Sequence, residues 1–266
     1  MLYLAVLAGI IQGLTEFLPI SSSGHLVLLH DFYFGIPDTL TFDVVLHVGT
    51  LLALLVFFRK DLGSLIRGVF NSLKNWQVST NYEQRLAWFI LAGTIPAALV
   101  GYFWADFLEV TFRNSKSVAI MLIVFGVLLY LADIRGRKTE RLEQLTWGRS
   151  IIIGLAQALA LIPGVSRSGI TIIAGLGTNL NRLAATKYAF LLSIPIVTGA
   201  AIKKVYDLST VGYSGSIQAL LLGFLTAAVV GYFTIRYLLA FVSKHSLKVF
   251  AYYRIALGII ILLILT

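Results

Sequence analysis

Long apolar runs separated by short polar connections dominate the pattern of hydrophobic and polar positions along this chain. An α-helix needs about 20 mostly apolar residues to cross the roughly 30 Å of hydrocarbon in a bilayer. Six runs meet that requirement: 40–58, 86–107, 117–134, 183–202, 217–237 and 248–266. The pattern therefore predicts an all-α polytopic membrane protein with six transmembrane helices.

Two other apolar stretches, 1–29 and 150–177, are broken by Pro19 and Pro163 and by clusters of Gly and Ser. Irregular backbone at membrane depth is tolerated only where protein or a water-filled cavity surrounds it. We therefore expect each stretch to form a re-entrant helical hairpin, which enters the membrane and returns to the side it came from.

The chain also matches itself at two offsets. Five positions recur 145 residues later, so that Gln12, Leu14, Ser21, Ser23 and Gly24 match Gln157, Leu159, Ser166, Ser168 and Gly169. A second match, between 93–103 and 223–233, has an offset of 130. The change of offset predicts an insertion, and the polar stretch 71–84 is its expected place, as a cytoplasmic loop. Chance similarity between helices rich in Gly and Ala is the alternative explanation.

The repeat predicts how a single membrane domain, 1–266, is built. Its halves, 1–134 and 150–266, each hold one hairpin and three spans, which is an odd number of crossings, so the second half should run through the membrane upside down. Inverted-topology repeats of this kind bring their broken segments together near the midplane. The remaining segment, 135–149, is expected to be a cytoplasmic loop.

Composition agrees with a membrane protein and excludes several kinds of chemistry. The chain is 58% hydrophobic and 12% charged, with a formal net charge of +9. A basic charge can indicate nucleic-acid binding, but Lys and Arg lie largely between the apolar runs here, as the positive-inside rule expects. The absence of cysteine excludes disulfides and thiolate catalysis. We therefore expect membrane lipids as partners and no nucleic acid.

The basic residues also predict an orientation. In order, the connections after the first five spans hold five, two, five, two, and two or three Lys or Arg residues, if the hairpins do not cross. Cytoplasmic loops carry the excess of such residues. Both termini are therefore predicted to lie outside, with the first hairpin entering from the outside and the second from the cytoplasm.

Three ionisable residues, Glu16, His25 and Arg167, lie inside the broken apolar stretches. A charge at bilayer depth costs about 2.5–3.5 kcal/mol even on the lenient insertion scale, so these residues indicate a functional site by default. An ion pair that only fastens the hairpins together is the alternative, but it leaves the neighbouring hydroxyls unexplained. These hydroxyls belong to Ser21, Ser22, Ser23, Ser166, Ser168 and Thr171.

Phosphate is the ligand that suits this set of groups. An Arg167 guanidinium presents a fork to phosphate oxygens, while hydroxyls and a helix start donate further hydrogen bonds. Gly164 would let the chain approach closely or take positive φ. Glu16 and His25 are the candidates for proton transfer and for attack on phosphorus, and Gln12 lies on the same helix face as Glu16. Glu16 could also bind a divalent cation.

Other ionisable residues receive simpler interpretations. His30 and His47 lie near span ends, where interfacial hydrogen bonding is expected, and Asp43 is a secondary candidate for the site. Arg254 lies inside the last span and is expected to pair with an acid elsewhere in the bundle.

Two motifs carry a resemblance to a known family. Residues 12–25 read QGLTEFLPISSSGH and residues 163–171 read PGVSRSGIT. In this order they resemble the two signatures of the undecaprenyl-diphosphate phosphatase family, and the resemblance runs along the whole chain. Many members of that family have Glu where this chain has Gln12, which leaves Glu16 as the main carboxylate.

The resemblance implies a multi-pass enzyme of the plasma membrane that hydrolyses a long-chain polyprenyl diphosphate to the monophosphate and inorganic phosphate. That reaction recycles the lipid carrier for cell-wall glycan synthesis, and it bears on resistance to bacitracin, which sequesters the same diphosphate. The family's site opens to the outer face and uses a divalent cation, Mg²⁺ or Ca²⁺.

Carried over position by position, Glu16 would hold the metal or act as general acid and base, and Arg167 would hold the diphosphate. Attack by Ser22 would need His25 as its base, whereas attack by His25 would form a phosphohistidine, and the sequence leaves both open. The resemblance and the composition of the two motifs assign the remaining positions to substrate binding: Gln12, Ser21, Ser23, Gly164, Ser166, Ser168 and Thr171.

Two rival functions were weighed. Lipid phosphatases of the phosphatidic acid type also use Ser-Gly-His and Ser-Arg motifs, but the His and Asp that complete their second motif do not follow Arg167. A polyprenyl-phosphate transporter or flippase is the alternative from another class, because inverted repeats are typical of secondary carriers. His25 argues against it, since binding alone needs no nucleophile or base. The small-residue face Gly93 to Gly101 suits either a homodimer or packing within one bundle.

Overall fold

The computed structural model describes residues 2–32, 39–75, 81–135, 138–211 and 216–265. Within these ranges the regular structure is helical, apart from one isolated bridge between Glu140 and Leu180. The elements are α1 (Leu2–Thr15), α2 (Ser22–Phe32), α3 (Thr39–Phe57), α4 (Arg59–Asn75), α5 (Tyr82–Phe112), α6 (Ser115–Ile134), η1 (Leu142–Gln144), α7 (Trp147–Ala158), η2 (Leu159–Leu161), α8 (Arg167–Gly177), α9 (Arg182–Val211), α10 (Ile217–Val242) and α11 (Lys248–Leu265).

Among the described helices, five are long and apolar enough to cross a membrane, and α3 with α4 forms a sixth candidate. The six predicted spans fall on α3, α5, α6, α9, α10 and α11, so the all-helical, multi-pass prediction is confirmed. Several helices extend beyond the apolar runs because polar caps set their ends. Asn81 accepts a hydrogen bond from the Gln84 N–H at the start of α5, and Asn114 caps α6 in the same way through the Ser117 N–H.

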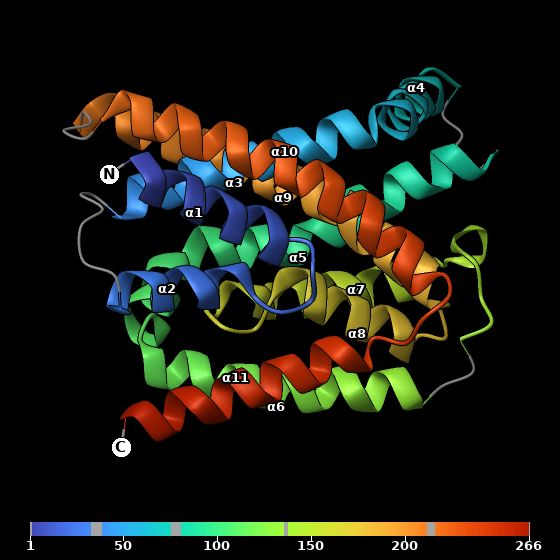
Figure 1. Cartoon of the computed structure of the whole chain (residues 1–266). Coiled ribbons are helices and arrows are strands. Elements are labelled where there is room, and N and C mark those ends of the chain that lie inside the picture. Colours follow the sequence, from blue (N-terminus) through green and yellow to red (C-terminus); the bar gives the residue numbers. More distant parts are fainter. Residues whose placement is uncertain (1, 33–38, 76–80, 136–137, 212–215, 266) are drawn as a thin grey trace.

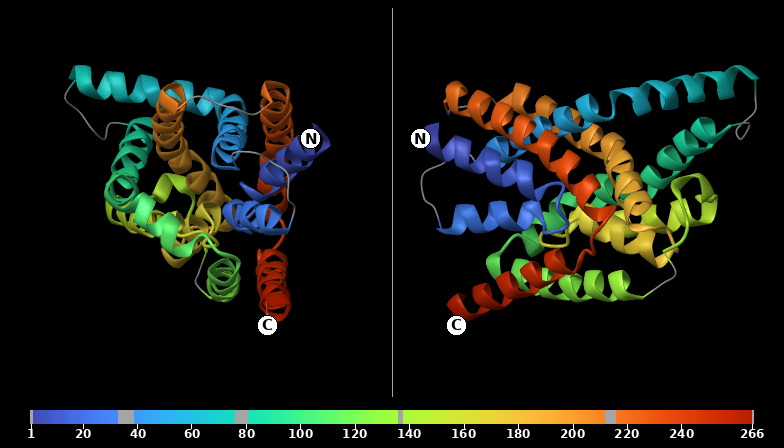
Figure 2. Two further views of the ribbon diagram at one scale, coloured as in Figure 1. Left: turned by 90° about the vertical axis from the view of Figure 1, so that its left-hand side faces the viewer. Right: turned by 45° about the vertical axis from the view of Figure 1, so that its right-hand side comes forward.

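The expected loop at 71–84 is partly wrong. The chain bends by 78° between α3 and α4, and α4 continues as a helix to Asn75. Residues 76–80 lie outside the described part of the chain. The polar Ser72 of this segment is buried and accepts a hydrogen bond from the Trp88 Nε1 of α5 at 3.0 Å, so a residue that looked like part of a loop belongs to a packed helix. Figure 2 shows α4 extending sideways past the end of the bundle.

The two broken segments form hairpins that enter the bundle from opposite ends. In Figure 1, α1 and α2 come from the end where the chain starts and finishes, whereas α7 and α8 come from the end where α3 meets α4. The first hairpin (α1–α2) and the second hairpin (α7–α8) meet inside the bundle, where α3, α6 and α9 surround them. The expected loop 135–149 contains η1 and the first turn of α7, because Trp147 already belongs to that helix.

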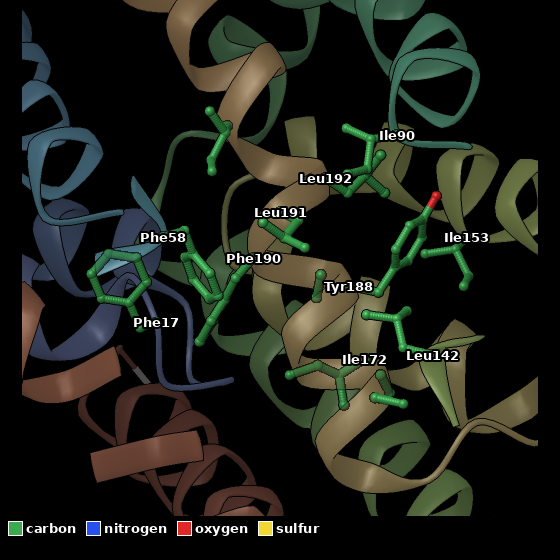
Figure 3. Close-up of a cluster of buried hydrophobic side chains, with 14 of the residues drawn as sticks. Phe17, Phe58, Ile90, Leu142, Ile153, Ile172, Tyr188, Phe190, Leu191 and Leu192 are labelled. Carbon is green, nitrogen blue, oxygen red and sulfur yellow. The ribbon is translucent and has the colours of Figure 1, made fainter. Parts of the chain in front are cut away.

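A buried aromatic cluster fixes the first hairpin against α9 (Figure 3). Phe17 packs edge-to-face on Phe190 with ring centroids 5.5 Å apart, and Phe58 packs on Phe190 from the bend between α3 and α4. Such aromatic pairs prefer this geometry and add stability beyond the area they bury. Because Phe17 follows Glu16 directly, this packing determines where the Glu16 side chain lies.

The second hairpin is anchored by close backbone packing against α5. A Cβ added to Gly154 of α7 would lie 2.2 Å from the Gly93 carbonyl oxygen, so only glycine fits there. Ser150 donates to the Phe89 carbonyl oxygen of α5 at 2.7 Å. The face that begins at Gly93 is therefore used for packing within the chain, and a homodimer stays a prediction without an assigned surface.

Candidate active site

The turns of the two hairpins have the same geometry. Ser21 has a φ of +76° and Ser166 a φ of +75°, in a region that few non-glycine residues occupy. The Ser21 Oγ accepts a hydrogen bond from the Gly24 N–H at 3.2 Å, and the Ser166 Oγ accepts one from the Gly169 N–H at 3.1 Å. The two serines, predicted to bind substrate, thus cap the starts of α2 and α8.

Hydroxyls of the motifs also join one hairpin to the other. Ser168 donates to the Leu18 carbonyl oxygen at 3.1 Å, and the Gly164 N–H donates to the Ser23 Oγ at 3.5 Å. Gly164 has a φ of +94°, and a Cβ there would lie 2.8 Å from Met121. Gly164 is therefore required by both backbone conformation and space. These contacts place the two turns side by side, as the paired motifs predicted.

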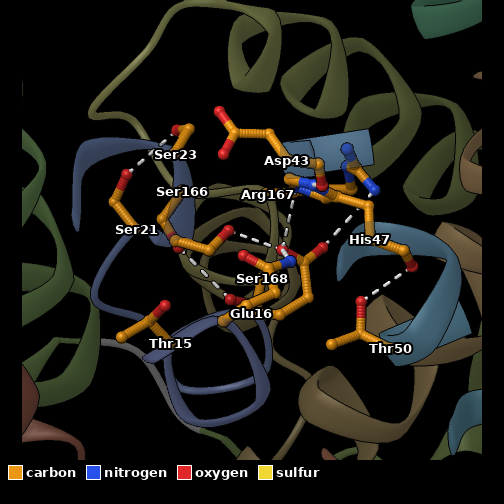
Figure 4. A network of polar contacts seen from close by, with 12 residues as sticks. Thr15, Glu16, Ser21, Ser23, Asp43, His47, Thr50, Ser166, Arg167 and Ser168 are labelled. Carbon is orange, nitrogen blue, oxygen red and sulfur yellow. Dashed lines mark hydrogen bonds and ion pairs between the residues drawn. The ribbon is translucent and has the colours of Figure 1, made fainter. Parts of the chain in front are cut away.

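The Glu16 carboxylate lies at the centre of the polar network drawn in Figure 4. Its Oε2 accepts hydrogen bonds from the Ser22 hydroxyl and from the Gln12 amide, the latter at 3.1 Å. The His47 Nε2 lies 3.5 Å from the same oxygen. The Arg167 Nη1 lies 3.7 Å from Oε1. The structure therefore brings the predicted residues Gln12, Glu16, Ser22 and Arg167 together around one carboxylate.

A small cavity opens beside this carboxylate. It is lined by Glu16, Phe17, Arg167, Ser168, Ala189, Phe190 and Ser193. The Arg167 Nη1 is buried and has no hydrogen-bond partner among the described residues. A buried guanidinium nitrogen without an acceptor is costly, and an oxygen acceptor that reaches this cavity would satisfy it.

His25 makes contacts other than the one predicted for a general base. Its Nδ1 lies 2.7 Å from the Ser21 carbonyl oxygen, and its Nε2 lies 2.8 Å from the Tyr253 hydroxyl of α11. Since a carbonyl oxygen only accepts, Nδ1 carries the proton and Nε2 accepts from Tyr253. Ser22 donates to Glu16 instead. The sequence left His25 open as the base of Ser22 or as the nucleophile, and both roles stay predictions, since in this structure Ser22 and His25 have other hydrogen-bond partners.

Thr171 does not offer its hydroxyl to the cavity. It is fully buried, and its Oγ1 donates to the Arg167 carbonyl oxygen at 2.7 Å, within α8. A threonine commonly bonds to the carbonyl four residues earlier in a helix. In this structure the hydroxyl therefore supports the helix that carries Arg167, and a role in substrate binding stays a prediction.

Arg254 is a part of the site that sequence reasoning misplaced. It is fully buried, and it donates to the carbonyl oxygens of Pro19 at 3.2 Å and of Gly164 and Val165 at 3.0 Å. The expected partner was an acid, but among the described residues these contacts are with main-chain carbonyls of both turns. Because Pro19 and Gly164 belong to different hairpins, Arg254 fastens the two turns to each other.

His47 also belongs to the site, although its position near a span end suggested an interfacial role. Its Nδ1 donates to the Asp43 carbonyl oxygen at 2.7 Å, one turn earlier in α3. The Asp43 carboxylate is occupied by Arg113 at 2.7 Å and by His30 at 2.9 Å. Asp43 therefore orients His47 through its main chain, while its side chain forms ion pairs further out. No local sequence signal relates His47 to Glu16, since the contact depends on how α3 packs on the first hairpin.

Comparison with known proteins identifies the family of this chain. Residues 5–260 match the family described as Bacitracin resistance protein BacA. An undecaprenyl-diphosphatase of Rubrobacter xylanophilus is 47% identical over 262 residues, which cover 97% of this chain and 96% of the relative. Undecaprenyl-diphosphatases of Geotalea daltonii and Thermobifida fusca are 48% and 44% identical over 259 residues, which cover 96% and 88% of those proteins. The match over nearly the whole length shows that this chain belongs to the BacA family.

Proposed function

We propose that this chain hydrolyses a long-chain polyprenyl diphosphate, such as undecaprenyl diphosphate, to the monophosphate and inorganic phosphate. One observation carries the proposal: the Ser22 hydroxyl donates to the Glu16 carboxylate, with the Arg167 guanidinium of the other hairpin beside it. A hydroxyl, a base and a phosphate-binding cation in contact are what phosphoryl transfer to a serine needs. The names of the relatives supply the substrate.

In this reaction the Ser22 Oγ attacks the terminal phosphorus and Glu16 takes the hydroxyl proton. The bond between that phosphorus and the bridging oxygen breaks, and the lipid monophosphate leaves with the electron pair. Glu16 gives the first proton to the departing monophosphate and becomes a carboxylate again. Water then attacks the phosphoserine and gives a proton to Glu16, which returns it to the Ser22 Oγ as inorganic phosphate leaves. Arg167 stabilises the charge on the transferring phosphoryl group throughout, and its buried Nη1, which has no hydrogen-bond partner among the described residues, supports this role.

The choice of Ser22 over His25 as nucleophile rests on hydrogen-bond partners. Ser22 is already bonded to a carboxylate that can accept its proton. The two ring nitrogens of His25 are engaged by the Ser21 carbonyl and by Tyr253. His25 then acts by fixing the turn that presents Ser22, and through Tyr253 it ties that turn to α11.

A divalent cation, Mg²⁺ or Ca²⁺, fits the same site. A single carboxylate, Glu16, lies at its centre, and hard cations are often bound by one or two carboxylates together with substrate phosphates. The cation would neutralise charge on the diphosphate when bound. Around it, Gln12 and Ser22 orient the carboxylate by donating to its Oε2.

The proposal includes six spans and two re-entrant hairpins in an inverted repeat, with both termini outside and the site open to the outer face of the plasma membrane. Helix packing supports the repeat: α1 packs along α10, and its counterpart α7 packs along α5, the counterpart of α10. The described ends of α1 and α11 lie at the same end of the bundle (Figure 1). An enzyme in this position would return the lipid carrier to cell-wall synthesis and would influence bacitracin sensitivity.

Phosphate release from farnesyl or undecaprenyl diphosphate by the full chain in detergent, with added Mg²⁺, tests the function. We expect Ser22→Ala and Arg167→Ala to abolish release. Ser243→Ala is the matched control, because the exposed Ser243 hydroxyl donates to the Ala240 carbonyl oxygen at the end of α10. Full release by both site variants would contradict the site. An absence of release by the folded unmodified chain would favour the transporter alternative, which uptake assays in vesicles would then test.

A further inference from the structure

We propose that His47 is a ligand of the divalent cation, so that the His47 Nε2 and the Glu16 carboxylate hold one ion that the diphosphate completes. This inference rests on the proposed function, and it adds a residue that neither motif contains. It also predicts a preference among metals that an all-oxygen site would not have.

The separation of the two groups suits ligands of a single ion. The His47 Nε2 lies 3.5 Å from the Glu16 Oε2. A metal with bonds of about 2.0–2.2 Å to nitrogen and oxygen places neighbouring ligand atoms about 3.0–3.5 Å apart. The contact is also long for a direct hydrogen bond. A shared cation explains it better than an ion pair does.

The orientation of the ring supports the same conclusion. The His47 Nδ1 donates to the Asp43 carbonyl oxygen at 2.7 Å, so the lone pair of the neutral ring is on Nε2, the atom that faces Glu16. Ligating histidines usually donate their other ring N–H to a carbonyl or carboxylate in this way. The Thr50 hydroxyl, which donates to the His47 carbonyl oxygen at 2.9 Å, adds a further contact to this turn of α3.

A second observation points to a bound ligand at the same place. Gln12 is fully buried, and its Oε1 has no hydrogen-bond partner among the described residues, although its Nε2 donates to Glu16. Buried amide oxygens are rarely left without a partner. A cation beside Glu16 would provide one, with the amide supplying an oxygen in place of a second carboxylate.

The residues present suit an open metal site, in which the substrate completes the coordination shell of the cation. Among the described residues no three His, Asp or Glu side chains gather around one point, so the protein alone does not complete a coordination shell. The Arg167 guanidinium faces the other carboxylate oxygen, Oε1, so the cation would share Oε2 with the hydrogen bonds from Ser22 and Gln12. With one imidazole and one carboxylate, the site should favour Mn²⁺ or Co²⁺ over Ca²⁺, because imidazole suits transition metals whereas Ca²⁺ takes oxygen ligands.

Pulsed electron paramagnetic resonance of Mn²⁺ tests this inference without any turnover. The full chain in detergent would be loaded with Mn²⁺ and methylenediphosphonate, and modulation from a coordinated imidazole nitrogen is expected. His47→Gln should remove the modulation and weaken Mn²⁺ binding about tenfold or more. His245→Gln is the matched control, since this exposed histidine stacks on Phe241 at the end of α10 and should leave both signals unchanged.

Two further variants make the outcome decisive. His25→Gln should keep the nitrogen modulation, and its loss there would assign the ligand to His25 and overturn the proposal. His47→Asn guards against a folding defect in His47→Gln, since both should lose the modulation while circular dichroism stays native. Modulation that persists in both His47 variants, or is missing from the unmodified chain, would also overturn it. Phosphate release with Mg²⁺ by the unmodified chain tests the proposed function separately.

Discussion

The two hairpins have the same turn and different chemistry. Ser21 and Ser166 have the same backbone conformation and cap a helix in the same way. At the positions that carry chemistry the hairpins differ, because Glu16, Ser22 and His25 of the first hairpin correspond to Leu161, Arg167 and Ile170 of the second. The repeated serine and glycine positions therefore maintain the fold, and the unrepeated positions make the site.

This difference explains how one site is assembled from a duplicated element. Two identical hairpins would place like groups opposite each other, and two carboxylates in contact would repel. Here one hairpin supplies a carboxylate and the other a guanidinium, so the opposite charges of Glu16 and Arg167 attract each other across 3.7 Å. In the proposed reaction the first hairpin supplies the reacting groups and the second binds the phosphate.

Glu16→Gln is expected to have the largest effect, since it removes the base from the first hairpin while keeping its shape. Hydrolysis should fall about 10³-fold, within the range for loss of general acid–base catalysis. Glu109→Gln is the control, because this carboxylate is 43% exposed and forms an ion pair with Arg113. Steady-state phosphate release measures both. Equal rates for the two variants would place the base elsewhere.

Arg167→Lys tests the second hairpin and should lower turnover about 10²-fold, because a lysine keeps the charge but cannot present a planar fork to phosphate. Arg182→Lys is the control, since Arg182 forms a comparable forked pair with Asp133 away from the site. A loss confined to substrate affinity, with kcat unchanged, would show that the second hairpin only binds the ground state.

Arg254→Met tests whether the hairpins must be fastened together. It leaves several carbonyls of the two turns without a donor, and we expect a loss of stability of about 2 kcal/mol, which lowers the melting temperature in detergent. Arg236→Met is the matched control, because Arg236 is exposed on α10. Unchanged melting in Arg254→Met would mean that the turns stay together without this residue.

The smallest effect concerns the shared turn itself. Ser21→Gly and Ser166→Gly keep the positive φ without strain but remove the cap hydroxyl, so each should lower stability by less than about 1 kcal/mol, and by the same amount. Thermal unfolding of the two variants side by side measures the difference. A markedly larger loss for one of them would show that the turns are not equivalent.

The sequence by itself determined the helical spans and the two motifs. Runs of apolar residues long enough to cross a bilayer are a local property, so α3, α5, α6, α9, α10 and α11 could be predicted from composition alone. The two motifs could be assigned to one site because a charge at bilayer depth costs free energy, which singles out Glu16 and Arg167 as functional residues. The repeat offset identified Ser21 and Ser166 as equivalent before any contact was known.

Only the tertiary structure decided which groups touch. His47 reaches Glu16 because α3 packs beside the first hairpin. Arg254 binds main-chain carbonyls, and since every residue has a carbonyl, the sequence does not show which ones it contacts. Similarly, the Ser22 hydroxyl could reach either Glu16 or His25 from its position in the motif. Its direction depends on the positive φ of Ser21 and on Tyr253 engaging His25, and these follow from packing across the whole bundle.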